Sequence, residues 1–188
     1  MNKTERLLNK NSYMITRGHD FVEINGVKWA TCNLGAENPE DPGLYFRWGD
    51  KKGYTKDFIE SNNGKKPIFD VFYENIRDFF DVVRFLWGGK WRMPTPDEFL
   101  ALNRANKVTH CFKDITCKVF NSNCKSVIFP FSGAAIEEDI SLENISAYYW
   151  TKEGYDGTTA KFACIDDYIT VGHASNNYGF NIRPVLDI

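Results

Sequence analysis

Residues 87–99 read WGGKWRMPTPDEF and contain the clearest helix start in the chain. Thr95 stands at the N-cap position, Pro96 at the first helical position, and Glu98 three residues after the cap. The Thr95 hydroxyl can accept a hydrogen bond from the Glu98 amide, while the Glu98 carboxylate reaches back to the amide of the cap residue. The segment therefore predicts a helix from Pro96 to about Ala105.

The sequence before this helix predicts a hairpin and a second helix. Residues 21–24 and 27–31 have strand-like composition and are joined by Asn25-Gly26. This pair is a strong two-residue turn signal, because both turn positions need positive φ. Between residues 67 and 86 the chain is strongly apolar. Apolar residues there keep roughly helical spacing (Ile76, Phe79, Phe80, Val83 and Leu86), which predicts one amphipathic helix.

After the capped helix the pattern changes to short strands and turns. Strands are expected near 117–121, 126–130, 147–151, 159–165, 168–172 and 181–186, in addition to one at 44–48. Residues 49–66 are polar and are expected to form a long surface loop. Two helices combined with many short strands predict an α+β fold with antiparallel sheets.

The composition indicates one globular domain. The chain has 188 residues, of which 43% are hydrophobic, 26% charged and 15% aromatic. This length suits a single domain, which we place at residues 20–188. The formal net charge of −2 excludes a global field that would attract nucleic acid or an anionic membrane. No apolar run is long enough to span a bilayer, so no membrane insertion is expected.

The N-terminal residues differ from the rest. Residues 1–11 read MNKTERLLNKN and lack the apolar core of a signal peptide. The chain is therefore expected to be cytosolic, or to leave the cell without a signal of its own, as a virion protein does on lysis. Residues 1–19 are predicted to be an arm for attachment or oligomerisation, which implies a homo-oligomer and other virion proteins as partners.

Six segments, taken in order, carry a family resemblance. They are VEINGVKWATCNLGA (22–36), NPEDPGLYFRWGD (38–50), WGGKWRMPTPDEF (87–99), VIFPFSGAA (127–135), SAYYWTKE (146–153) and YGFNIRPVLD (178–187). Together they resemble the Fibrobacter succinogenes major paralogous domain, over about residues 21–187. The chain departs from that family in a longer and more aromatic 51–86 region, and in Thr151-Lys152-Glu153 in place of Ser-Ser-Thr.

The resemblance implies a C-type-lectin-like fold. In such a fold the first and last strands pair, two helices flank small twisted antiparallel sheets, and long loops rise on one side. Formylglycine-generating sulfatase-modifying enzymes and the receptor-binding tips of some phages share this architecture. The resemblance therefore favours a phage virion component, such as a head or tail decoration or fibre protein. The alternatives are a bacterial binding protein of the cytoplasm or cell surface, or a degenerate relative of the sulfatase-modifying enzymes.

Catalytic and cofactor motifs are missing from the sequence. The five cysteines include no CxxC pair, and His110, Cys111, Cys117 and Cys124 lack the tight ligand spacing of a zinc site. Sulfatase-modifying enzymes need a reactive cysteine pair near the C-terminal end, where this chain has only Cys164. No GxSxG and no phosphate-binding GxxxxGK[ST] occurs. We therefore expect no enzyme activity, no cofactor and no metal.

Calcium-dependent sugar binding has one weak candidate. Asn38-Pro39-Glu40-Asp41 offers amide and carboxylate oxygens, which suit a hard cation. The motif lies in the early family block, far in sequence from the sugar-binding loops of C-type lectins, so no calcium site is predicted.

Tryptophans and two arginines are expected to stabilise the fold. Trp29, Trp48, Trp87, Trp91 and Trp150 lie beside glycines or strand residues, where large apolar side chains fill a loop-rich core. Arg92 and Arg183 lie in apolar strings, so each needs a planar partner or several carbonyls. The expected partners are Glu40, Asp41 and Asp50.

A recognition surface is predicted on the C-terminal loops. Residues 146–158 and 166–178 are rich in tyrosine, asparagine and aspartate. Such residues give contact area and adaptable hydrogen bonds at low entropic cost. The predicted binding residues are Tyr148, Tyr149, Tyr155, Asp166, Asp167, Tyr168, His173, Asn176, Asn177 and Tyr178. The expected ligand is a host-surface glycan or protein. The alternative is that these segments are solvated loops whose tyrosines lie flat on the surface, because such loops have the same composition.

Overall fold

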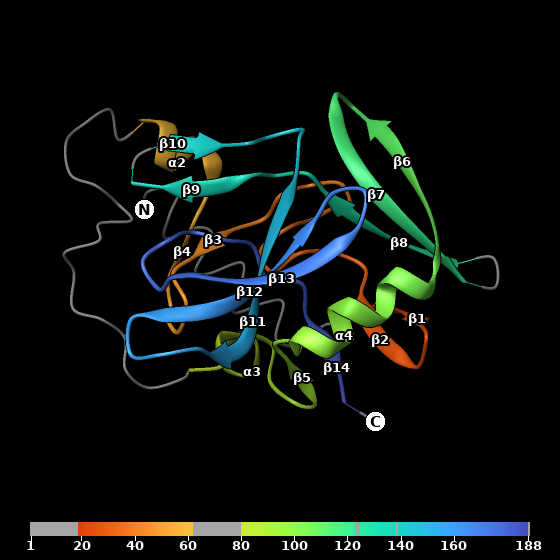
Figure 1. Cartoon of the computed structure of the whole chain (residues 1–188), viewed down its shortest axis with the longest axis horizontal. Coiled ribbons are helices and arrows are strands. Elements are labelled where there is room, and N and C mark those ends of the chain that lie inside the picture. The colour runs from red at the N-terminus through yellow and green to blue at the C-terminus, as the bar shows by residue number, and fades with distance from the viewer. Residues whose placement is uncertain (1–18, 62–79, 123–124, 138, 188) are drawn as a thin grey trace.

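Strands dominate the structure, which is a computed structural model describing residues 19–61, 80–122, 125–137 and 139–187 (Figure 1). Over these ranges the strands form five small antiparallel sheets, accompanied by short helices. The prediction of a mixed fold with antiparallel sheets is confirmed at this level. Most of the expected arm, residues 1–18, lies outside the described residues, as does the start of the expected amphipathic helix.

A four-stranded sheet contains strands from both ends of the sequence. Its spatial order is β1 (Phe21–Ile24), β2 (Val27–Ala30), β14 (Val185–Leu186) and β5 (Trp91–Arg92). The β1–β2 hairpin turns at Asn25 and Gly26, whose φ angles of 50° and 82° confirm the predicted turn. The last strand, however, pairs with β2 and β5 and not with β1, which corrects the expected pairing of first and last strands.

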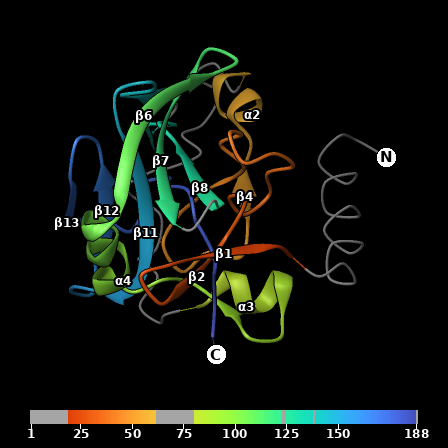
Figure 2. The same ribbon diagram turned by 90° about the vertical axis from the view of Figure 1, so that its right-hand side faces the viewer.

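The segment from residue 81 to residue 101 forms two helices joined by β5. Helix α3 (Val82–Trp87) begins at Asp81, whose carboxylate caps the helix and also accepts from the Met93 amide. Gly88 and Gly89 follow with φ angles of 67° and 58°, so this turn favours two glycines. Figure 2 shows α3 near the end of the molecule that holds the four-stranded sheet.

Helix α4 (Pro96–Ala101) has the predicted start. The Thr95 hydroxyl accepts from the Glu98 amide at 3.1 Å, and the Glu98 carboxylate accepts from the Thr95 amide at 2.7 Å. A 3-10 turn, η1 (Leu102–Arg104), completes the segment to the predicted end near residue 105. Of the expected amphipathic helix, the described part is helical only from Val82, because Phe80 and Asp81 precede the helix and Asp81 is its cap; residues 67–79 lie outside the described residues.

The remaining strands form four sheets. Three strands make one of these, β6 (Asn106–Phe112), β7 (Ile115–Ser122) and β8 (Lys125–Pro130). Another contains β11 (Ala147–Gly154), β12 (Thr159–Ile165) and β13 (Ile169–Ser175). Two-stranded sheets consist of β3 (Tyr45–Phe46) with β4 (Gly53–Tyr54), and of β9 (Ala134–Ile136) with β10 (Asp139–Ser141).

Several of these elements were not predicted. The expected loop at 49–66 contains β4 and helix α2 (Lys56–Ser61). Strand β6 was missed because it has no buried residue, so its sequence shows no alternation of apolar and polar positions. Of the expected strand at 181–186, only the last two residues pair as a strand.

The five tryptophans are all buried, which confirms their predicted core role. Trp29 and Trp150 are fully covered. Trp87 and Trp91 contact each other edge to face, with ring centroids 5.1 Å apart, and the His19 ring stacks on Trp87 at 3.6 Å. The last residue of the expected arm is therefore in contact with the core.

Arg183 is fully buried and forms hydrogen bonds without a carboxylate partner among the described residues. Its guanidinium donates to Asn33 Oδ1 and to the carbonyls of Ala30, Thr31 and Ile128, at 2.6 to 3.0 Å. The predicted use of several carbonyls is confirmed, but the expected acidic partners are wrong.

Arg92 pairs with carboxylates other than the expected ones. It donates to both oxygens of Glu98 and also bonds to Asp187. The three expected partners are engaged elsewhere, Glu40 with Lys113, Asp41 with Asn38 and Asp50 with Arg47. The Arg92 guanidinium lowers the pKa of both carboxyl groups that it contacts, against the opposing effect of burial.

Replacing Arg183 by methionine tests the importance of the buried guanidinium. The Arg183→Met protein loses the donors for Asn33 and three carbonyls, and we expect a loss of about 3–5 kcal/mol in the free energy of unfolding. Urea denaturation measures this loss. The matched control is Arg84→Met, since the Arg84 side chain is 50% exposed and its ion pairs contribute roughly 0–1 kcal/mol. Equal effects of the two changes would contradict the prediction.

Candidate functional site

A pocket of about 420 Å³ opens between the β9–β10 pair and the sheet of β11, β12 and β13. Its lining is mostly apolar and aromatic, and it also includes hydroxyl groups and one imidazole. The lining residues are Ala134, Ile136, Ser141, Leu142, Tyr148, Thr159, Phe162, His173, Ala174, Ser175, Tyr178 and Phe180. Pockets of this size and composition are typical small-molecule sites.

Four aromatic rings form one cluster in this lining. The ring centroids of Tyr148, Phe162 and Phe180 are separated by 5.2 to 5.7 Å. Tyr178 joins the group at 6.2 Å from Phe180. Rings in contact at these distances hold one another in place, so the cluster gives a ligand a rigid apolar surface.

Gly172 leaves room for one of these rings. It is paired with Phe162 across β12 and β13. A Cβ atom at Gly172 would lie 3.0 Å from Cζ of the Phe162 ring. Any larger residue there would therefore displace the ring.

Beside the pocket, Tyr155 stacks on His173. The ring centroids lie 4.1 Å apart, the planes differ by 8°, and 59% of Tyr155 is exposed. The loop that carries Tyr155 is held by Asp156, which accepts from the amides of Thr158 and Thr159. The bonds from Thr158 are the main reason that the pKa of Asp156 falls to about 2. The stacked pair is thus an exposed platform on an ordered turn.

The structure brings only part of the predicted surface together. Tyr148, His173 and Tyr178 line the pocket, and Tyr155 stacks beside it. Phe162 and Phe180 were missed as pocket residues, because apolar residues in strands are indistinguishable by sequence from core residues.

Tyr149 is a core residue, which corrects its predicted place on the surface. It is fully buried, and its hydroxyl accepts from Asn33 Nδ2 at 3.3 Å. Burial raises the pKa of Tyr149 to about 12. Successive strand residues point to opposite faces, so Tyr148 and Tyr149 cannot both face the pocket.

Asn176 and Asn177 are also buried, with 1% and 2% exposure, and this corrects their assignment to an exposed edge. The Asn176 amide donates to the Thr158 carbonyl, and its own carbonyl accepts from the Trp48 amide. The Asn177 amide donates to Ser175 Oγ. Both residues serve to close the turn that follows β13.

Asp166, Asp167 and Tyr168 lie at the other end of the sheet. They form the turn between β12 and β13, whereas Tyr155 and His173 lie near the opposite end of this hairpin. A seven-residue strand extends roughly 20 Å, so the two groups do not form one site. Tyr168 is 70% exposed, with the Lys107 ammonium 5.2 Å from its ring centroid.

Three of the described thiols, those of Cys32, Cys117 and Cys164, are poor nucleophiles. Burial raises the pKa of Cys32 and Cys164, and raises that of Cys117 to about 12. Over the described ranges, no three His, Cys, Asp or Glu side chains are grouped as metal ligands. In the considered calcium motif, the Asp41 carboxylate accepts from Asn38, and Glu40 pairs with Lys113.

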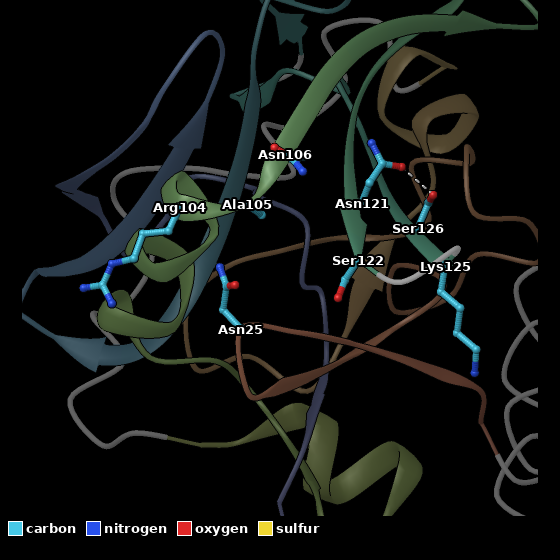
Figure 3. Close-up of a pocket in the computed structure, with 8 residues that line it drawn as sticks. All are labelled: Asn25, Arg104, Ala105, Asn106, Asn121, Ser122, Lys125 and Ser126. Carbon is cyan, nitrogen blue, oxygen red and sulfur yellow. Dashed lines mark hydrogen bonds between the residues drawn. The ribbon is translucent and has the colours of Figure 1, made fainter.

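A second, polar pocket of about 430 Å³ lies between the β1–β2 turn, η1 and the β7–β8 hairpin. It is lined by Asn25, Arg104, Ala105, Asn106, Asn121, Ser122, Lys125 and Ser126. Figure 3 shows Arg104 and Lys125 extending in different directions, so their charges do not converge. Asn25 donates to the Ala101 carbonyl, and Asn121 accepts from Ser126. This pocket is therefore the weaker candidate.

Comparison of the chain with protein-family models, curated proteins and solved structures gives no match. Within the described part of the chain, helices are too short or too polar to cross a bilayer. The geometry of the site is thus the basis for a functional proposal.

Thiol labelling tests this view of the cysteines. Cys111 is exposed, whereas Cys117 is buried with a raised pKa. We expect iodoacetamide at neutral pH to alkylate Cys111 first and Cys117 only on unfolding, as measured by peptide mass spectrometry over time. Rapid labelling of Cys117 or Cys164 in the folded protein would reveal an activated thiol and reopen a catalytic role.

Proposed function

We propose that the chain is a non-enzymatic binding protein with a C-type-lectin-like fold, and that it holds a sugar ring of a host-surface glycan in the aromatic pocket. The observation that carries this proposal is the ring cluster of Tyr148, Phe162 and Phe180 beside the exposed stack of Tyr155 on His173. Aromatic faces pack against the apolar face of a sugar ring, while Ser175, Tyr178 and His173 offer hydrogen-bonding groups.

Two features support the C-type-lectin-like fold. Strands from both ends of the sequence share one sheet, in which β14 lies between β2 and β5. The other sheets of the chain are small and are joined by long connections, and the capped helix α4 follows directly after β5. The family motifs also fall on these elements, since WGGKWRMPTPDEF spans the end of α3, β5 and the start of α4.

A glycan array with matched variants tests the ligand and the site. We expect Tyr155→Ala and Gly172→Val each to weaken glycan binding about tenfold, the first by removing the platform and the second by displacing the Phe162 ring from its place in the pocket lining. Tyr168→Ala is the control, because this tyrosine is at least as exposed but lies at the other end of the hairpin.

If Tyr168→Ala weakens glycan binding while Tyr155→Ala and Gly172→Val do not, recognition takes place at the Asp166–Tyr168 turn. If the chain instead binds host proteins that carry no glycans, and the same two variants lose this binding, the pocket remains the binding site but its ligand is a protein. Unchanged binding in all three variants, with unchanged unfolding curves, would remove the pocket as the site.

The phage assignment has its own test. We propose a virion protein because of the resemblance to domains that also occur in receptor-binding tips, with the arm binding other virion proteins. Mass spectrometry of purified particles from lysates that contain the chain should detect it at a fixed ratio to capsid protein. Its absence from particles would favour a bacterial binding protein of the cytoplasm or cell surface.

A further inference from the structure

Strand β6 has an open hydrogen-bonding edge. It pairs with β7 over all seven residues in an unbroken register, from Asn106 opposite Asn121 to Phe112 opposite Ile115. Among the described residues, the backbone groups of β6 bond only in this ladder. Figure 1 shows β6 at the outer side of its sheet, next to β7, as the strand order β6–β7–β8 requires. About every second residue of β6 therefore directs its backbone N–H and C=O groups away from β7.

Other long outer strands have partners that engage their backbone groups. In β13, the Ile169 amide and carbonyl bond to the side chain of Asn103, at 2.9 and 2.8 Å. In β8, the carbonyl of Ile128 accepts from Arg183. The edge of β6 differs from both of these edges in having no such contact within the described part of the chain.

Features that usually block an edge are also missing from β6. Its sequence, NKVTHCF, has no proline, and its register has no bulge. Its one lysine, Lys107, turns toward Asn103 and Tyr168. Val108 is 55% exposed, and His110 and Cys111 are exposed too. A long and nearly uncharged edge of this kind is a template for pairing with another strand.

We infer that β6 pairs antiparallel with β6 of a second copy of the chain, which joins the two three-stranded sheets into one sheet of six. A twofold axis at Thr109 places Val108 of each copy opposite His110 of the other, and Lys107 opposite Cys111. Among the side chains of β6 itself, no like charges are opposed in this register, and Val108 of each copy lies beside His110 of the other. The contact is self-complementary, which favours a second copy over an unrelated strand.

The contact area of one strand edge is small, so the dimer is weak unless the copies are held together. Sedimentation velocity of the full chain over a range of concentrations should show a reversible monomer–dimer equilibrium. Hydrogen–deuterium exchange should slow at residues 106–112 as the concentration rises. Exchange at the 169–175 edge should stay unchanged, because β13 lies outside the proposed contact.

A charge-swap pair locates the interface. Val108→Lys with His110→Lys opposes like charges twice across the twofold axis, and should weaken the dimer about tenfold. Val108→Glu with His110→Lys opposes unlike charges at the same positions and should restore or strengthen it. Both residues are exposed, so the two proteins should unfold at similar urea concentrations.

Two outcomes would overturn the inference. One is a wild-type chain that stays monomeric at the highest concentration reached. The other is a dimer whose dissociation constant does not distinguish the two charge variants, since that dimer must use another surface. Neither result bears on glycan binding, because the aromatic pocket contains no β6 residue.

Discussion

The buried guanidinium of Arg183 connects parts of the chain that local structure leaves separate. It donates to carbonyls at the end of β2 and in β8, and to the side chain of Asn33. Its guanidinium carbon also lies 4.7 Å from the centroid of the Phe129 ring, in the main core cluster. Burial lowers the pKa of Arg183, and neighbouring Tyr149 opposes this effect. A buried charge is tolerated here because its donors meet fixed acceptors.

Local signals in the sequence predicted local structure well. The Asn25-Gly26 turn and the Thr95–Glu98 capping box each depend on residues at most three apart, and both form as expected. Arg92 has a near partner, Glu98, but its other partner Asp187 lies 95 residues away, and Asn33 lies 150 residues from Arg183. Composition could show that these arginines needed partners, but it could not say which polar groups the fold would bring near them.

The candidate site shows the same limit. Richness in tyrosine pointed to the sheet that lines the aromatic pocket, where Tyr148, His173 and Tyr178 meet. The alternation of strand side chains then separates Tyr149 from Tyr148, and the turn after β13 buries Asn176 and Asn177. Side-chain type indicates what a residue can bind, whereas exposure depends on contacts that form only when distant segments pack. Phe162 and Phe180 were missed for this reason.

The position of β14 between β2 and β5 has a consequence for how the chain folds. Ala30 and Arg183 are separated by 153 residues, yet they are in contact. Next to this contact, β14 pairs with β2 and completes the sheet. During synthesis the first hairpin leaves the ribosome long before its neighbouring strand exists. Closing so large a loop is slow compared with hairpin formation, because chain entropy must be lost before any stabilising contact is made. Until then the inner edge of β2 stays open, and the nascent chain is vulnerable to pairing with other chains.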